Sequence, residues 1–391
     1  MNISSETNNV TSSLSNSLST LDEALVGLFS LIFCVGVIGN SFVIYVFGAK
    51  YKDLRSKQEI LILLLAVVDF IASIANPALF IYYTVTKYGR WDFGEAGCKI
   101  FPTIGPVATS WSQGIILIMA LDRDRAIVTP LKSSFSSKTI YKAVAVALLL
   151  SMLSYFDYTW YLTSHGQKTC QGYGDHLLTY IIPRICSLLI SDILFLIIFV
   201  ATITRVYLIL RRKDVMGFDE VTKKYRKEKN RRAMRLLLTM GTVFAFCIYP
   251  RDLYQLSYHV SLVIPPKMVF DQKLLNINAA LKVFHTANSC VNVFIYAFMH
   301  PKMKLEIKRL SRRLTLCTRK KISFEIKRKP GLTSKTIRSA TENTRIRSST
   351  ENTILGSPTI SKMALNLTVF TKNNDDVFEN NNTRFTTTSV T

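Results

Sequence analysis

Four charged side chains stand in a row at the end of an apolar stretch: Asp122, Arg123, Asp124 and Arg125. A carboxylate neutralises a neighbouring guanidinium, and a movement of the supporting helix frees the guanidinium to meet backbone carbonyls of a partner protein. Charges with two alternative sets of partners form a switch. The plainer interpretation is that these charges only mark the boundary between a membrane and water. The motif alone leaves both interpretations open.

A second group of polar residues lies inside apolar sequence. Asp69 stands in the middle of LLLAVVDFIAS, where a carboxylate is costly and therefore indicates a function. Its candidate partners carry amide or hydroxyl oxygens, which suit small hard cations and water. These candidates are Asn40, Ser112, Asn288, Ser289 and Asn292. Asn288, Asn292 and Tyr296 follow one another at intervals of four residues, so they share one helix face.

The elements that must position these residues are long apolar segments. The chain has 391 residues, of which 49% are hydrophobic and only 19% are charged. A helix needs about 20 apolar residues to cross roughly 30 Å of hydrocarbon at about 1.5 Å per residue. Seven segments meet this requirement: 24–49, 59–84, 100–121, 140–162, 180–210, 235–263 and 274–299. We therefore expect an all-α integral membrane protein with a seven-transmembrane helix bundle.

The distribution of basic residues predicts the orientation in the membrane. The net charge is +23, no Lys or Arg precedes Lys50, and the basic residues gather in the odd-numbered links and after the seventh segment. Cytoplasmic loops retain Lys and Arg, so the N-terminus is expected outside the cell. The positive charge then reflects topology and contact with membrane lipids rather than nucleic-acid binding. The outer tail offers glycosylation sequons at Asn2 and Asn9.

Four parts are expected along the chain: an extracellular tail (1–23), the transmembrane domain (24–299), an amphipathic interfacial helix (300–317) and a disordered cytoplasmic tail (318–391). The short eighth helix follows from apolar residues on one face and Lys and Arg elsewhere. Cys317 at its end is a candidate for palmitoylation. The tail is rich in Ser, Thr and Asn, which predicts disorder and suits phosphorylation, although an unmodified tail has the same composition.

Two cysteines fall on the expected outer side of the membrane. Cys98 begins the third apolar segment, and Cys170 lies in the link between the fourth and fifth segments. Because the outside of a cell is oxidising, these two form the natural disulfide pair.

The order of the motifs resembles the rhodopsin family (class A) of G-protein-coupled receptors over about residues 24–317. The resemblance rests on Gly39-Asn40, LAVVD ending at Asp69, WDFG at 91–94, Cys98, DRDRAIVTPL at 122–131, FAFCIYP at 244–250 and NSCVNVFIY at 288–296. It implies a plasma-membrane receptor, and not an enzyme, that transduces an extracellular ligand into activation of a heterotrimeric G protein. It also implies arrestin-type partners on a phosphorylated tail.

The resemblance assigns roles to individual residues. Asp122, Arg123, Asn292 and Tyr296 resemble the family's G-protein switch. The set around Asp69 resembles its sodium pocket, so an allosteric sodium ion is the only cofactor implied; the set consists of Asp69, Ser112, Asn288, Ser289 and Asn292. Departures from the family pattern indicate a divergent receptor. Asp124 replaces the usual Tyr, Ile248 replaces the usual Trp before Pro250, and Val293 replaces the Pro of the last motif. Helix four also lacks its usual Trp, helix five lacks its usual Pro, and Asn230 stands where many relatives have a Glu.

The sequence also narrows the class of ligand. Gly105 stands where amine receptors carry an Asp, and Thr286 stands where opsins carry the retinal Lys, so both classes are disfavoured. Charged candidates in the ligand cavity are Asp192, Arg251, Asp252 and Lys282, which either contact a charged ligand or pair with one another. Asn76-Pro77 resembles the Pro placement of peptide receptors, so a peptide, as in neuropeptide receptors, is the favoured ligand. A small acidic or lipid-like ligand is the alternative.

Two other classes of protein fit the sequence less well. A transporter is disfavoured because the two halves of the chain show no inverted repeat. An enzyme is disfavoured because the sequence has neither a metal-binding cluster of His and acidic residues nor a GxSxG elbow.

Overall fold

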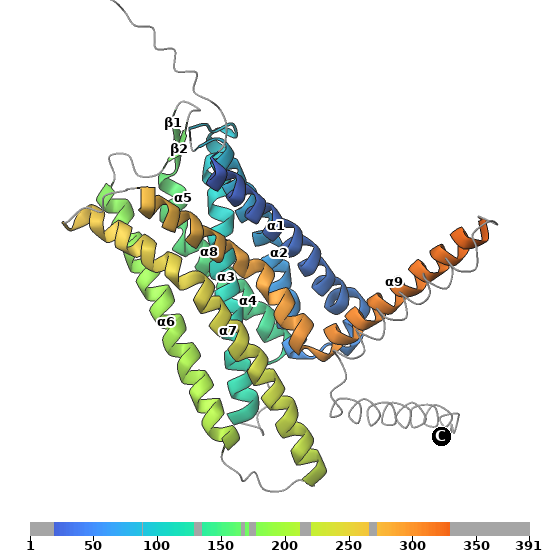
Figure 1. Ribbon diagram of the computed structural model, residues 1–391. Coiled ribbons are helices and arrows are strands. Elements are labelled where there is room, and N and C mark those ends of the chain that lie inside the picture. The colour runs from blue at the N-terminus through green and yellow to red at the C-terminus, as the bar shows by residue number, and fades with distance from the viewer. Residues whose placement is uncertain are drawn as a thin grey trace, which may run out of the picture. The chain divides into compact units, whose positions relative to one another are not determined.

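The computed structural model describes residues 19–87, 89–128, 135–165, 169–171, 177–211, 220–265 and 272–328. Asn2 and Asn9 lie outside this part of the chain, and so does the side chain of Cys317. The long helices are α1 (Thr20–Ile44), α2 (Lys57–Val85), α3 (Gly94–Val128), α4 (Ser137–Ser154), α6 (Leu177–Arg211), α7 (Glu220–Val263), α8 (Gln272–Met299) and α9 (Pro301–Arg328). Figure 1 shows α1–α4 and α6–α8 gathered into one bundle.

Short elements connect these helices. A π-helix, η1 (Tyr45–Lys50), continues α1, and a 3-10 helix, η2 (Lys52–Leu54), leads toward α2. The helix α5 (Phe156–Tyr161) follows α4, and the antiparallel strands β1 (Thr163–His165) and β2 (Thr169–Gln171) pair Ser164 with Cys170. The two strands lie at one end of the bundle (Figure 1).

The starts of α1 and α2 follow from local sequence. The Ser19 hydroxyl oxygen accepts a hydrogen bond from the backbone N–H of Asp22, and the Asp22 carboxylate accepts one from the backbone N–H of Ser19. Ser56 and Glu59 repeat this capping box at the start of α2. Each box satisfies N–H groups that a helix leaves without intrahelical partners.

Within the described residues, six helices are long and apolar enough to cross a membrane: α1 with η1, α2, α3, α4, α6 and α7. The predicted seventh segment corresponds to α8, which has the required length but a less apolar composition. Its polar residues His285, Asn288 and Asn292 are buried, so they face the other helices and not lipid. The mean hydropathy of such a helix is low because it averages over all residues, including polar ones on the face that points into the bundle.

Several predicted segments differ from the observed helices. The helix expected at 235–263 begins at Glu220 as α7. The expected helix 140–162 is divided, because α4 ends at Ser154 and α5 begins at Phe156. The carbonyl of Ser154 accepts hydrogen bonds from the Arg184 guanidinium (3.4 Å) and the Ser187 hydroxyl (3.2 Å), so its partners come from α6. The helix expected at 300–317 continues as α9 to Arg328.

Candidate functional site

Asp69 lies at the centre of the bundle and is only 1% exposed. Its Oδ1 accepts a hydrogen bond from the Ser112 hydroxyl of α3 at 3.1 Å. Its Oδ2 accepts one from the Asn292 side-chain amide of α8 at 2.9 Å. One carboxylate of α2 therefore joins three helices through uncharged donors.

The surroundings of Asp69 hold further polar atoms. The side-chain amide of Asn40 donates to the backbone carbonyl of Ser289 at 2.9 Å, and Asn288 is also buried. Among the described residues, neither Oδ1 of Asn40 nor the hydroxyl of Ser73 has a hydrogen-bond partner, although both are buried. Ser73 stands four residues after Asp69 and shares its helix face. The buried Ser73 hydroxyl, on the same helix face as the Asp69 carboxylate, fits a small hard cation with water.

Asp122 and Arg123 lie near the end of α3, and we call this end of the bundle the Arg123 end. The Asp122 carboxylate is fully buried, and its Oδ2 accepts a hydrogen bond from the Arg123 guanidinium at 2.7 Å. Its Oδ1 accepts one from the backbone N–H of Phe135 at 3.3 Å. The charge of Arg123 is therefore held by its immediate neighbour in the sequence.

Arg123 also borders a cavity of about 410 Å³ between α2, α3, α7 and the start of α9. Glu228 and Arg232 of α7 line this cavity and form an ion pair with each other. Outside the cavity lining, Asp124 lies 3.6 Å from the guanidinium of Arg205 on α6. Asp124, which stands where the family motif usually has a Tyr, thus forms an ion pair between α3 and α6.

The four expected switch residues divide into two groups in the structure. Asp122 and Arg123 bond to each other, whereas Asn292 bonds to Asp69. Tyr296 is fully buried in the core, and its hydroxyl has no hydrogen-bond partner among the described residues. Asn292 therefore belongs with Asp69 and not with Arg123.

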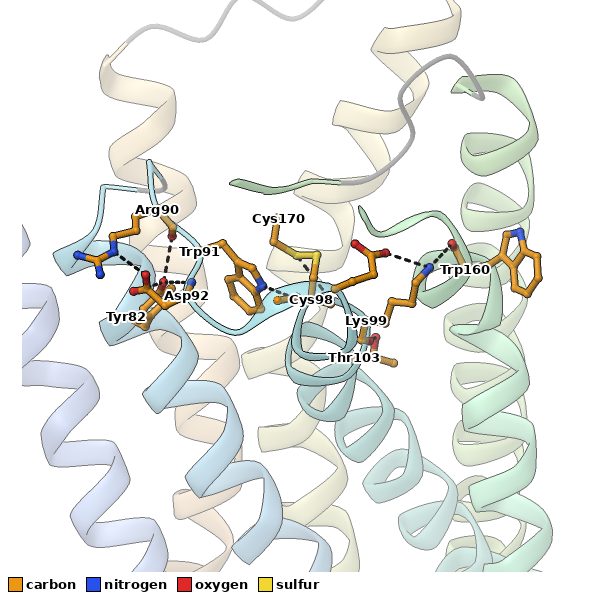
Figure 2. The surroundings of a disulfide bond; sticks show 11 residues. Tyr82, Arg90, Trp91, Asp92, Cys98, Lys99, Thr103, Trp160 and Cys170 are labelled. Atoms are coloured by element: carbon orange, nitrogen blue, oxygen red, sulfur yellow. Dashed lines mark hydrogen bonds and ion pairs between the residues drawn. A yellow bond between two sulfur atoms is a disulfide. The ribbon is translucent and has the colours of Figure 1, made fainter. Parts of the chain in front are cut away.

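Figure 2 shows the opposite end of the bundle, which we call the disulfide end. Cys98 of α3 and Cys170 of β2 form the predicted disulfide. Trp91 is buried beside it and donates from its indole nitrogen to the carbonyl of Gly94 at 2.8 Å. The Tyr82 hydroxyl donates to the carbonyl of Arg90 at 3.1 Å and accepts from the backbone N–H of Asp92 at 3.0 Å. The loop before α3 is thereby tied to α2.

The four charged ligand-pocket candidates do not lie in one place. Asp192 of α6 and Asp252 of α7 line the same small cavity, together with Gln113 and His285. Arg251 and Lys282 both lie over the ring of Phe80, with their charged groups 6.0 Å and 5.5 Å from its centroid. Asp192 and Asp252 thus share one cavity, Arg251 and Lys282 lie over one aromatic ring, and Arg251 remains within electrostatic reach of Asp252.

The Gly105 position explains why an amine-receptor Asp has no place here. A Cβ at this glycine would lie 1.7 Å from Oδ1 of Asn76, far inside van der Waals contact. The side chain of Asn76 occupies the space that any larger residue at this position would need.

Three functional candidates were missing from the sequence prediction. Arg184 borders the cavity of Asp192 and Asp252, and its guanidinium lies 4.1 Å from the centre of the Tyr155 ring. Glu59 bonds to Lys302 at 2.9 Å, and Glu306 bonds to Lys50 and Tyr51. The capping-box pattern of Ser56 and Glu59 was visible in the sequence, but the partners from α9 were not.

Comparison with known proteins identifies the family. Residues 39–296 match the family model of the 7 transmembrane receptor (rhodopsin family). The matched residues make up more than half of the chain. The chain belongs to this family. It is therefore a multi-pass membrane receptor and not an enzyme, and the helices α1–α4 and α6–α8 form the family's transmembrane bundle.

The individual relatives share about a quarter of their residues with this receptor. It is 26% identical over 299 residues to the somatostatin receptor type 2 of Mus musculus, covering 73% of this chain and 76% of the relative. It is 26% identical over 319 residues to the chemerin-like receptor 1 of Rattus norvegicus, covering 74% and 78%. It is 25% identical over 308 residues to the C-C chemokine receptor type 1 of Macaca fascicularis, covering 76% and 82%.

Proposed function

We propose that this receptor lies in the plasma membrane with its N-terminus outside, responds to a peptide and activates a heterotrimeric G protein. The observation that carries the proposal is the Asp122–Arg123 pair beside the cavity at the Arg123 end. The guanidinium is bound within its own helix, so it can exchange Asp122 for partner carbonyls without loss of a contact between helices.

The peptide assignment is supported by the relatives, which are named for somatostatin, chemerin and C-C chemokines. It is also supported by the disulfide end, where charged side chains of both signs border cavities among the helices. A peptide carries both kinds of charge together with apolar side chains, so it complements such a surface.

The Asp69 centre is proposed to bind a sodium ion. Asp69 would supply the charge, and Ser112, Asn288, Ser289 and Asn292 would surround the ion. A bound cation would neutralise the buried carboxylate and hold α2, α3 and α8 in one arrangement. Further expected features are glycosylation of Asn2 and Asn9, palmitoylation of Cys317, lipid contact of α9 and arrestin-type binding to the tail.

The test is nucleotide exchange on a G protein in cells that express wild type or Arg123→Ala at matched surface levels. Synthetic peptides should raise exchange in wild type, and the response of Arg123→Ala should fall at least a hundredfold, since no guanidinium remains to bind the partner. Arg125→Ala is the matched control, because this neighbouring guanidinium packs over the ring of Phe135 at 5.0 Å. An undiminished response of Arg123→Ala would refute the switch assignment.

A further inference from the structure

The helix α9 is held by other segments near its start. Lys302 donates to the Glu59 carboxylate of α2 at 2.9 Å. Glu306 forms an ion pair with Lys50 of η1. From position 311 to position 316, by contrast, every side chain is exposed. Opening the helix over this stretch uncovers no packed side chain, and such segments open at the lowest cost in free energy.

A sequence pattern repeats within α9. It consists of two basic residues, one aliphatic residue and one hydroxyl residue, and it occurs nowhere else in the chain. Its three copies are KRLS (308–311), RRLT (312–315) and KKIS (320–323). The side chain of Ser323 lies outside the described residues, so the structure bears on Ser311 and Thr315 alone. These two hydroxyl residues are four positions apart and share one face of the helix.

The two hydroxyl groups do not join α9 to another segment in the described part of the chain. Thr315 donates to the backbone carbonyl of Ser311 at 2.9 Å, which is a bond within the helix. Ser and Thr are also weaker helix formers than Lys or Gln. A helix that only has to lie on a membrane surface therefore gains nothing from a hydroxyl residue at this repeated position.

The basic residues before each hydroxyl group suit recognition by a protein kinase. A substrate cleft lined by carboxylates selects positive side chains at fixed distances from the hydroxyl group. In the transfer, the hydroxyl oxygen attacks the γ-phosphorus of ATP, and the bond from this phosphorus to the oxygen of ADP breaks. ADP leaves with the electron pair, and the hydroxyl proton passes to a carboxylate of the kinase. Each phosphate then adds about 1.5 to 2 negative charges near pH 7.

We propose that Thr315 and, more slowly, Ser311 are phosphorylated by a kinase that selects basic sequences, and that anionic lipid restricts this reaction. The order follows from the second basic residue of each copy of the pattern. Arg309, two residues before Ser311, is bound to Glu306 at 2.6 Å. Arg313, two residues before Thr315, is exposed and has no ion pair among the described residues. A kinase therefore engages the Thr315 copy without breaking an ion pair of the chain.

Anionic lipid restricts the reaction because the same segment suits a membrane surface. Leu310 and Leu314 are exposed and stand one helical turn apart. Lys304, Lys308 and Arg312 are exposed as well. Apolar and basic side chains together bind a surface of negatively charged lipids. A segment held on that surface does not enter a kinase cleft, and phosphate added to it opposes its return by repulsion between like charges.

This modification rests on the proposed function in one respect, because the proposed orientation places α9 on the cytosolic side, where ATP is available. The test uses the full-length receptor in nanodiscs, ATP and the catalytic subunit of the cyclic-AMP-dependent protein kinase. Mass spectrometry of peptides locates the phosphate. In phosphatidylcholine, Thr315 should gain phosphate at least fivefold faster than Ser311. Mixing in an equal amount of phosphatidylserine should slow both reactions at least threefold.

Variants separate recognition from mere exposure. Arg312→Gln combined with Arg313→Gln should lower the rate at Thr315 at least tenfold, although the hydroxyl group remains. The matched control is Lys304→Gln, which removes an exposed charge of the same helix that precedes no hydroxyl residue by two or three positions. Its rate at Thr315 in phosphatidylcholine should equal that of wild type.

Glu306→Gln tests the order of the two sites. It releases Arg309, so the rate at Ser311 should rise about threefold. No phosphate on Thr315, or a rate there that the double Arg variant leaves unchanged, would overturn the site. A rate at Thr315 that phosphatidylserine does not change would overturn the control by lipid.

The result is separable from the proposed function, because nanodiscs expose both faces of the receptor. An epitope appended after Thr391 tests the orientation by itself: staining of intact cells would refute the proposed orientation, whatever the nanodiscs show. Peptide-evoked nucleotide exchange that depends on Arg123, with no phosphate on Thr315 in nanodiscs, would refute only the modification site.

Discussion

Asp69 and Asp122 are both buried carboxylates of the same bundle, yet their partners differ in kind. Asp69 accepts hydrogen bonds from uncharged groups on α3 and α8, whereas Asp122 is bound to the guanidinium of the next residue on its own helix. A change at Asp69 therefore acts on the packing of three helices. A change at Asp122 acts first on one charge.

Among the substitutions that test the difference between Asp69 and Asp122, Asp69→Asn should have the largest effect. The variant has nearly the same shape and can still hydrogen-bond Ser112 and Asn292, but it no longer attracts a cation. The free energy of coupling between two allosteric sites is typically at least about 1 kcal/mol. Replacing choline by sodium as the cation of the buffer should therefore weaken the affinity of wild type for its agonist about fivefold. Asp69→Asn should show no sodium dependence in the same radioligand assay. A sodium effect preserved in the variant would place the ion elsewhere.

A smaller effect is expected at the Arg123 end for Asp122→Asn. An amide holds a guanidinium less firmly than a carboxylate does, so Arg123 should be released without ligand more often. Basal nucleotide exchange should rise about threefold, which corresponds to about 0.7 kcal/mol of population shift. Sodium dependence should remain as in wild type. If basal exchange changed with Asp69→Asn and not with Asp122→Asn, the contrast between the two carboxylates would be wrong.

The two regions also differ in how far the sequence predicted them. Ser112 and Asn292, two of the five candidate partners, hydrogen-bond to Asp69. They could be predicted because each side chain is polar inside an apolar helix, and such residues must find one another. The fold followed from the lengths of the apolar segments and the order of the motifs. The pairing of Cys98 with Cys170 followed from their expected positions outside the cell.

Contacts between distant surface segments were not predictable in this way. Asp124 was known to depart from the family motif, but its partner Arg205 depends on how α3 and α6 cross. The surroundings of Arg251 and Asp252 are a second example. They are neighbours in sequence, yet the side chain of Asp252 lines the cavity of Asp192, whereas that of Arg251 lies over the ring of Phe80. Which way two consecutive side chains of a helix point relative to other helices is fixed by packing and not by spacing.

Glu306 of α9 is another buried carboxylate, and it lies outside the membrane-spanning helices. Unlike Asp69 and Asp122, it has several charged partners from different segments. Burial raises the pKa of Glu306, but hydrogen bonds from Lys50, Tyr51 and Arg309 outweigh it, and the pKa lies below its ordinary value of 4.5. A lowered pKa stabilises the folded state above the ordinary value, and this contribution is lost as the pH falls through the lowered pKa.

Glu306→Gln should therefore have the smallest effect of the series. Near neutral pH it should lower the free energy of unfolding by at most about 1 kcal/mol, because the cationic partners are partly in contact with water. Between pH 6 and pH 3 the thermal midpoint of wild type should fall more steeply than that of the variant, since only wild type loses this ionised carboxylate. Glu228→Gln is the control, because the Glu228–Arg232 pair is exposed. Identical pH profiles of wild type and Glu306→Gln would show that this carboxylate, unlike Asp69 and Asp122, contributes nothing through its charge.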